Sequence, residues 1–224
     1  MVHRRREVSR VEGFSDAVFG FAVTLLVVSL EVPKTFDELM LMMRGFPAFA
    51  VSFAVLFTIW WRHYTFFRRY DLEDTFVIAM SGVLLFVVLF YVYPLKFLWS
   101  MVLASVVGGG KATITARDGA TLFEIYGAGV AASFGVLALL YGHAYSRRGA
   151  LGLTPVEAAE ARVDVYSNLG IAGLGVLSAV LAIVLLRVAP ALVGLAGYLY
   201  FGIGISEWTI GEYGNRVRRR LENG

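Results

Sequence analysis

The sequence contains no cysteine. Disulfide bonds, thiolate metal sites and cysteine nucleophiles are therefore excluded. Histidine is also scarce, because His3, His63 and His143 are its only copies and lie far apart in the chain. A membrane enzyme would need a nucleophile, a base or metal ligands close together. We therefore expect no enzymatic activity, no structural metal site, no cofactor and no small-molecule substrate.

Charged residues are few as well, at 17% of the 224 residues, whereas 58% are hydrophobic. The mean hydropathy is +0.70. This composition is typical of an integral membrane protein, and the pattern of apolar runs predicts an all-α fold. The net charge of +3 does not indicate nucleic-acid binding, because the arginines flank apolar runs and form no single basic face.

Apolar runs of membrane-spanning length predict one domain, residues 1–224, with six transmembrane helices in a lipid bilayer. The approximate spans are residues 14–31, 46–67, 75–95 with an extension to 107, 120–145, 167–188 and 191–212. We expect a short linker at 34–44 and a loop at 108–119. In the polar connection 147–164, Thr154 and Pro155 predict a helix start. The first run begins with Phe-Ser-Asp and ends with Leu-Glu-Val-Pro, unlike a signal peptide, so we expect this helix to be retained.

Basic residues are distributed unevenly between the two sides of this arrangement. Fourteen lie on the side shared by the N-terminus, the second-to-third and fourth-to-fifth connections and the C-terminal tail, and six lie on the other. By the positive-inside rule, both termini are predicted to be cytoplasmic.

A glycine-rich run in the fourth span, Gly127-Ala128-Gly129, superficially resembles a dinucleotide-binding fingerprint. No strand precedes it, and small residues at this spacing are what helices use to pack in lipid. We therefore expect close helix packing there.

The chain is organised around its first apolar helix, which follows a polar cluster containing Arg10, Ser15 and Asp16. At about 100° per residue, one stripe of this helix carries Phe21, Thr24, Leu25 and Val28. Asp16 lies about 140° away from Phe21. Periodicity alone favours ordinary helix packing as the explanation of the stripe, and it does not identify a pore.

Asp16 has two interpretations. A carboxylate at membrane depth usually faces a protein interior or a water-filled path. It can also be a helix-start residue that interacts with the positive end of the helix dipole.

Two sequence patterns resemble a known family. Arg10-x-x-x-Phe14-Ser15-Asp16 precedes an apolar helix that contains Ala22-Val23-Thr24, and the second span contains Trp60-x-x-His63. These patterns resemble the lysosomal and endosomal potassium channels, the transmembrane protein 175 family, and their prokaryotic homologues. The third span also contains a proline near its predicted end, Tyr93-Pro94, as members of this family tend to.

The resemblance implies a potassium-selective cation channel of a prokaryotic plasma membrane, without a carbonyl filter loop. The first helix would line the pore. Because the signature occurs once, four chains would form a homotetramer with cyclic symmetry. Carried over by position, the pore constriction would be formed by Phe21, with further rings at Leu25 and Val28, and Thr24 would supply the selectivity hydroxyl.

The sequence departs from the family at the constriction, where Ile or Leu is usual and this chain has Phe21. Four phenyl rings would be bulkier, and could gate by dewetting or block the pore. The Phe could also turn sideways and leave the gate to Leu25. In this family the signature residues would form a network that fixes the position of the pore helix. In this chain they are Arg10, Phe14, Ser15, Asp16, Trp60 and His63. We expect a hydrogen-bonded cluster of Arg10, Ser15, Asp16 and His63, which favours a structural role for Asp16.

Other classes of membrane protein fit the sequence less well than a channel does. A secondary transporter of small cations or protons would show paired repeats and interrupted helices near mid-membrane, and neither is visible in the sequence. A purely structural membrane protein would share this composition, and only the signature argues against it.

Overall fold

The structure is a computed structural model that describes residues 8–28, 33–107 and 114–222, without the side chains of some helical residues, among them Val28. These ranges contain helices and no strand, which confirms the predicted all-α class for them. The elements are α1 (Arg10–Val28), α2 (Phe36–Tyr70), α3 (Thr75–Val107), α4 (Ala116–Ser146), α5 (Pro155–Val188), the 3₁₀ helix η1 (Pro190–Phe201) and α6 (Gly202–Glu222).

Among the described residues, five segments are long and apolar enough to cross a membrane. They are α2, α3 as far as Val102, α4, α5 and the stretch Pro190–Gly214, which combines η1 with most of α6. The first two turns of α1 contain Arg10, Glu12 and Asp16, which leaves a shorter uncharged run from Ala17 onwards.

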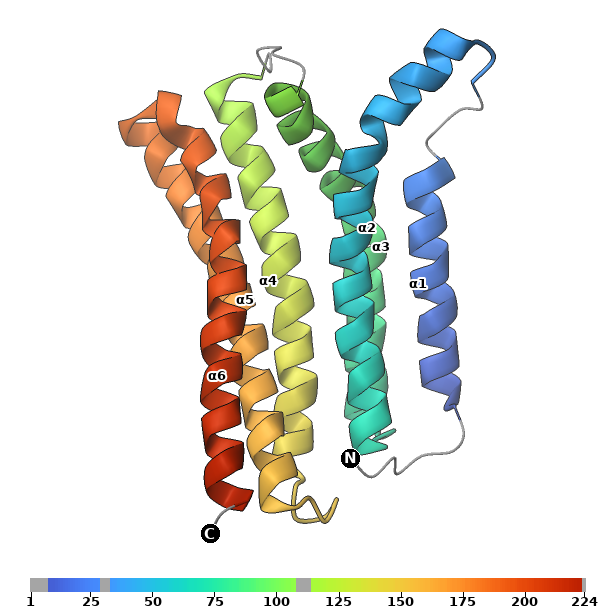
Figure 1. Cartoon of the computed structure of the whole chain (residues 1–224), viewed down its shortest axis with the longest axis vertical. Helices are drawn as coiled ribbons and strands as arrows, with labels where there is room; N and C mark the ends of the chain where they lie inside the picture. The colour runs from blue at the N-terminus through green and yellow to red at the C-terminus, as the bar shows by residue number, and fades with distance from the viewer. Residues whose placement is uncertain (1–7, 29–32, 108–113, 223–224) are drawn as a thin grey trace.

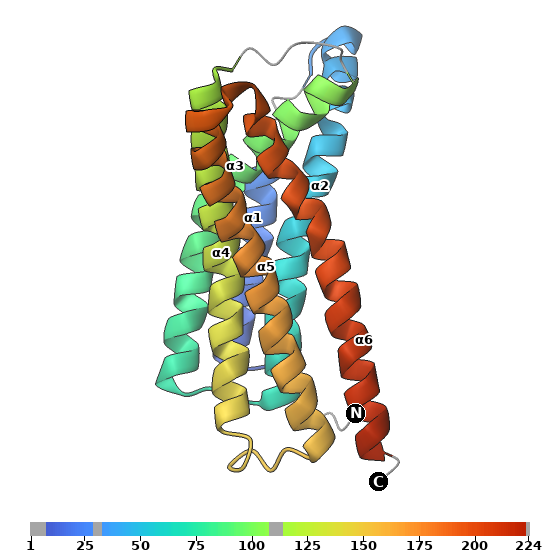
Figure 2. The same ribbon diagram turned by 90° about the vertical axis from the view of Figure 1, so that its left-hand side faces the viewer.

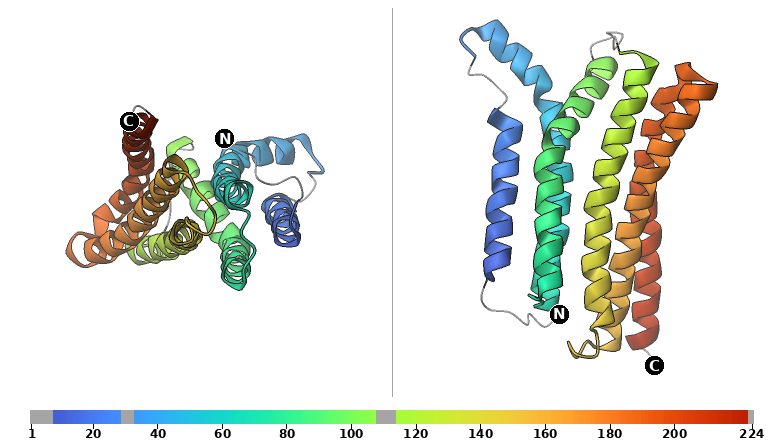
Figure 3. Two further views of the ribbon diagram at one scale, coloured as in Figure 1. Left: turned by 90° about the horizontal axis from the view of Figure 1, so that it is seen from below. Right: turned by 180° about the vertical axis from the view of Figure 1, so that it is seen from behind.

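The helices lie side by side in an elongated bundle (Figure 1). α1 occupies one edge next to α2 and α3, α4 follows, and α5 and α6 form the other edge. The view from below, in Figure 3, shows α1 set to the outside of α2 and α3. η1 and α6 run back along α5 (Figure 2).

One end of the bundle carries many arginines, and we call it the basic end. The start of α1, the α2–α3 turn, the α4–α5 connection and the end of α6 all lie there, at the bottom of Figure 1. Its exposed or half-buried arginines include Arg68, Arg69, Arg147, Arg148 and Arg216.

The expected linker at 34–44 is wrong, because α2 begins at Phe36. Thr35 caps the helix by accepting a hydrogen bond from the Glu38 backbone N–H at 3.2 Å. The Glu38 carboxylate accepts one from the Lys34 N–H at 2.7 Å. These caps start the helix ahead of Pro47, which lies inside α2; the first turns of α2 bend away from the rest (Figure 1).

The predicted helix start at Thr154 and Pro155 is confirmed. Thr154 and Glu157 form a capping box, in which each side chain accepts a hydrogen bond from the other residue's backbone N–H. α5 is therefore helical from Pro155, well ahead of the apolar run that begins at 167.

The turn between α2 and α3 is tied to the end of α4. Asp74 accepts a hydrogen bond from the Val77 N–H at 3.0 Å, and its other carboxylate oxygen lies 2.7 Å from His143 Nε2. The hydrogen bond from His143 is the main reason that the pKa of Asp74 lies below its usual range. Asp74 is therefore ionised at neutral pH, and His143 has a structural partner.

Gly127 and Gly129 of α4 pack against neighbouring helices, which confirms the packing interpretation of Gly127-Ala128-Gly129. A Cβ atom on Gly175 of α5 would lie 2.7 Å from the Gly127 carbonyl oxygen, and a Cβ on Gly127 would overlap the Gly175 carbonyl. Gly129 lies against the ring of Tyr91 on α3. The backbones of α4 and α5 thus approach as closely as small residues permit.

We expect Gly127→Ala to destabilise the fold by about 1–3 kcal/mol, the usual cost of overpacking a tight contact. The new methyl group has no space against Gly175, so α4 and α5 must separate. The thermal unfolding midpoint of the purified protein in detergent measures this loss. Gly135→Ala is the matched control on α4, because nothing lies within 4 Å of its Cβ position. Equal midpoints for the two variants would contradict the packing argument.

Candidate functional site on the first helix

α1 has one face packed into the protein and one face exposed. Phe19, Ala22 and Leu26 are buried against α2 and α3, whereas Phe14 is 64% exposed and Phe21 is 58% exposed. Two large aromatic side chains on the exposed face of an apolar helix indicate a surface that meets lipid or another chain.

The residues of the predicted stripe lie partly on the exposed face of α1 and partly at its border with the packed face. Phe21 and Thr24 are exposed, and Leu25 is half-buried against the core. The side chain of Val28 lies outside the described residues. Among the described side chains of the stripe, Phe21 and Thr24 are therefore the ones that face outward within one chain.

The Thr24 hydroxyl is held by the backbone of its own helix. It donates a hydrogen bond to the Phe21 carbonyl at 2.7 Å. A hydroxyl has one proton and two lone pairs. With its proton committed to Phe21, the exposed oxygen of Thr24 can act towards the outside only as an acceptor.

Asp16 lies on the side of α1 that faces α2. Its carboxylate accepts a hydrogen bond from the indole N–H of Trp60 at 2.7 Å, and Asp16 is half-buried. The structure therefore brings these two signature residues together and joins the first two helices through them.

The other signature residues have separate environments. His63 is buried, and its Nε2 lies 3.1 Å from the Ser81 hydroxyl on α3. Its ring also packs on Phe19 of α1 and on Phe67. Ser15 is fully buried, and its hydroxyl has no hydrogen-bond partner within the described part of the chain.

Arg10 is exposed at the start of α1, where Ser9 and Glu12 form the cap. Within the described part of one chain, the expected hydrogen-bonded cluster of Arg10, Ser15, Asp16 and His63 is therefore wrong: Ser15 has no partner, and Asp16 and His63 bond to other residues. The donor to Asp16 is the Trp60 indole, and the partner of His63 is a serine on α3. The sequence contains one indication of the pair formed by Trp60 and Asp16: an indole N–H donor lies one helical turn before His63, on the same helix.

The other end of α1 is contacted from α3. The Lys96 ammonium donates a hydrogen bond to the Leu26 carbonyl at 2.8 Å. α1 is therefore bonded to α2 near its start and to α3 near its end. No pattern in the sequence points to Lys96, because its contact depends on which part of α1 lies next to α3.

Comparison with known proteins supports the resemblance. Residues 10–91, which cover α1, α2 and about half of α3, match the family model described as endosomal/lysosomal potassium channel TMEM175. A potassium channel of Marivirga tractuosa is 36% identical over an alignment of 208 residues, and the alignment covers 88% of this chain and 84% of the relative. The chain belongs to the TMEM175 family. With five apolar helices of sufficient length, it is a multi-pass membrane protein.

Solved structures of this family extend the match to the whole fold. The crystal structure of a variant of the potassium channel MtTMEM175, in complex with a nanobody–MBP fusion protein, is 32% identical with a TM-score of 0.83 and covers 96% of this chain and 97% of that one. A TMEM175 homologue from Chamaesiphon minutus is 22% identical with a TM-score of 0.52, over 87% of this chain and 96% of that one, and shows a shared fold.

A second polar site connects α2 to α5 and α6 and was missed by sequence reasoning. Arg62 donates to Ser167 at 3.0 Å, to Asn168 at 3.2 Å and to Glu207 at 2.6 Å. Ser167 also donates to Glu207. Only 15% of the Arg62 side chain is exposed, so this charge needs these partners.

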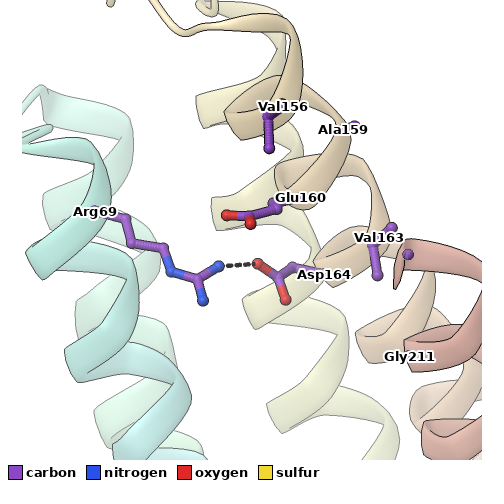
Figure 4. Close-up of a pocket in the computed structure, with 8 residues that line it drawn as sticks. Arg69, Val156, Ala159, Glu160, Val163, Asp164 and Gly211 are labelled. Atoms are coloured by element: carbon purple, nitrogen blue, oxygen red, sulfur yellow. Dashed lines mark hydrogen bonds and ion pairs between the residues drawn. The ribbon is translucent and has the colours of Figure 1, made fainter. Parts of the chain in front are cut away.

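A third polar contact lies towards the basic end. Arg69 donates to Asp164 at 2.8 Å beside a cavity of about 170 Å³ between α2, α5 and α6 (Figure 4). Glu160 also lines this cavity. Because Arg69 and Asp164 pair with each other, we assign them the structural role of joining α2 to α5.

We expect Trp60→Phe to lower the free energy of unfolding by about 1–3 kcal/mol, because the half-buried Asp16 carboxylate loses its donor. The thermal unfolding midpoint in detergent measures the change. Trp61→Phe removes the neighbouring indole, which is 53% exposed, and should cost about 0.5 kcal/mol or less. Similar losses for the two variants would argue against the role of the hydrogen bond.

Proposed function

We propose that this protein is a potassium-selective cation channel, in which α1 of four subunits lines the pore and no carbonyl filter loop is used. Membership of the TMEM175 family and the relatives named as potassium channels support ion conduction. The single observation that carries the pore assignment is the outward face of α1, where Phe21 and Thr24 lie exposed at helical spacing.

Thr24 suits the role of a selectivity residue. Its hydroxyl proton is donated to the Phe21 carbonyl, so the oxygen can accept contact from a cation. Hard cations such as potassium bind oxygen ligands. A ring of four such oxygens would replace part of the hydration shell of a permeating ion.

Phe21 suits the role of the main constriction. Its side chain is 58% exposed, whereas Leu25 is half-buried against the core. This difference favours Phe21 over Leu25 as the narrowest ring. Further apolar rings at Leu25 and Val28 remain part of the proposal. A narrow apolar ring of this kind would control flux by dewetting.

We propose a homotetramer with cyclic symmetry in the plasma membrane, because one chain supplies one copy of the pore helix. The basic end would face the cytoplasm, in accordance with the positive-inside rule. α1 would then be the sixth crossing, with its charged first turns at the cytoplasmic mouth and both termini inside. We expect no cofactor and no enzymatic activity.

Flux in liposomes that contain the purified protein tests this proposal. With potassium as the only permeant cation, flux should exceed the flux measured with sodium. Phe21→Ala removes the constriction and should increase potassium flux about tenfold, equivalent to ~1.4 kcal/mol of barrier. Flux in Phe21→Ala but not in the wild type would indicate a closed gate at Phe21. No flux from either tetramer would overturn the channel proposal.

Thr24→Val tests selectivity, because valine has nearly the same shape and lacks the hydroxyl. We expect the potassium-to-sodium permeability ratio to fall about tenfold, the equivalent of ~1.4 kcal/mol. The reversal potential under bi-ionic conditions measures the ratio. Thr58→Val is the control, because Thr58 is exposed on α2 and donates to its own helix at Ala54. An unchanged reversal potential for Thr24→Val would remove Thr24 from the selectivity site.

A further inference from the structure

A continuous row of aromatic side chains follows α2 to an arginine near the basic end. We call this row the aromatic column, and it consists of Phe53, Phe57, Trp61, Tyr64 and Arg68. The ring centroids of Phe53 and Phe57 lie 5.9 Å apart, and those of Phe57 and Trp61 lie 6.4 Å apart. The ring of Trp61 lies 5.8 Å from that of Tyr64, and the Arg68 guanidinium lies 5.9 Å from the centroid of the Tyr64 ring. Residues three or four apart on a helix are neighbours, so these contacts form one stripe.

The rings of the aromatic column are only partly covered by the rest of the chain. Trp61 is 53% exposed, Phe57 is 46% exposed and Phe53 is 38% exposed. α2 is one of the helices that are long and apolar enough to cross a membrane. An exposed apolar face on such a helix is covered by lipid or by another protein chain. The charge and the length of the column favour lipid.

The charge of Arg68 is not neutralised by a carboxylate in the described part of the chain. The neighbouring Arg69 donates to Asp164 at 2.8 Å, and Arg147 lies 3.4 Å from Asp74. Arg68 is half-buried and lies over an aromatic ring instead. A guanidinium can stack on a ring and still bind a phosphate through its N–H groups. Arg68 therefore has the chemistry of a phosphate-binding residue.

The length of the aromatic column matches one leaflet of a bilayer. Arg68 follows Phe57 by eleven residues, which is about 16 Å along an α-helix. Half of the hydrocarbon core of a bilayer is about 15 Å thick. Because α2 ends at Tyr70, Arg68 lies at the level of the headgroups, and Tyr64 lies at the interfacial depth that tyrosine prefers. Trp61 and Phe57 then lie beside the acyl chain.

We propose that the aromatic column is a binding site for an anionic phospholipid. The headgroup phosphate pairs with Arg68, and an acyl chain lies along Trp61 and Phe57. A zwitterionic lipid fits less well, because the cation of its headgroup competes with Arg68 for the phosphate. The site does not depend on which ion the protein conducts. The inference therefore goes beyond the proposed function and can fail independently of it.

Quenching of Trp61 fluorescence by brominated lipid tests the proposal. The full-length protein is reconstituted in vesicles of equal parts phosphatidylglycerol and phosphatidylcholine, with bromine on the acyl chains of one lipid at a time. Both preparations have the same surface charge, so they differ only in which lipid can quench. Trp60, Trp99 and Trp208 are the other tryptophans of the chain. The quenching that disappears in Trp61→Phe therefore belongs to Trp61.

We expect phosphatidylglycerol to bind next to Trp61 about five times more tightly than phosphatidylcholine, the contribution of one arginine near an anionic lipid. Arg68→Gln should bring this ratio close to one. Arg148→Gln is the matched control at the same end of the bundle. Arg148 also lies over a tyrosine, 4.7 Å from the centroid of the Tyr145 ring, and has no carboxylate partner among the described residues. Because Arg148 is not part of the column, its removal should leave the ratio unchanged.

Four results would overturn the inference. The first is equal quenching of Trp61 by the two lipids in the wild type, and the second is a ratio that Arg68→Gln leaves unchanged. The third is an equal fall in Arg148→Gln, which would assign the preference to the general charge of the basic end. The fourth is the absence of quenching of Trp61 by either lipid, which would show that another chain covers the column.

The headgroup alone is tested with glycerol 3-phosphate, which has the phosphate but no acyl chain. In excess, it should not reduce the quenching by brominated phosphatidylglycerol. Displacement of the lipid would overturn the inference in favour of a simple phosphate site. If Arg68→Gln does not fold, Arg68→Met replaces it, because methionine keeps an apolar stem on Tyr64 and removes the charge. A ratio close to one in Arg68→Met supports the inference, and the wild-type ratio overturns it.

Discussion

The pairing of Arg62 is the constraint on which the arrangement of the helices depends. A guanidinium that is only 15% exposed must have hydrogen-bond partners, because an unpaired buried charge would cost several kcal/mol. Its partners come from α5 and α6, and Tyr141 of α4 donates to the Arg62 carbonyl at 2.8 Å. Four helices therefore meet at one residue of α2. The next residue, His63, packs on Phe19 of α1, so the place of the first helix depends on the same turn of α2.

Much of the fold was predictable from hydropathy, because apolar runs of this length leave few alternatives to helices. The ends of the helices were less predictable. The segment 34–44 is polar enough to be interpreted as a linker, but the caps at Thr35 and Glu38 begin α2 there. In α5, Thr154 and Pro155 predict the start of the helix, but the polar turns that follow them are typical of a connection. Hydropathy indicates which part of a helix lies inside the membrane. The residue at which the helix begins is determined by capping hydrogen bonds.

The candidate site was predictable to the extent that it depends on one helix. Periodicity places Phe21 and Thr24 on one face and Asp16 on another, and the structure has the same division. The residues of other helices that hydrogen-bond to this site were not predictable from periodicity. The hydrogen bonds between Trp60 and Asp16, between His63 and Ser81 and between Lys96 and Leu26 join residues of different helices. Such pairs depend on the angle and position at which two helices cross, and the periodicity of a single helix carries no information about either.

The glycine contact between α4 and α5 has a mechanical consequence. At Gly127 and Gly175 the two backbones touch directly, so no side chain can change its rotamer to let one helix slide or rotate on the other. α4 and α5 should therefore move together as a rigid unit. α1, in contrast, is attached through side chains, which can change their rotamers. A change in the width of a pathway along α1 would therefore be accommodated between α1 and its neighbours, while the α4–α5 pair stays fixed.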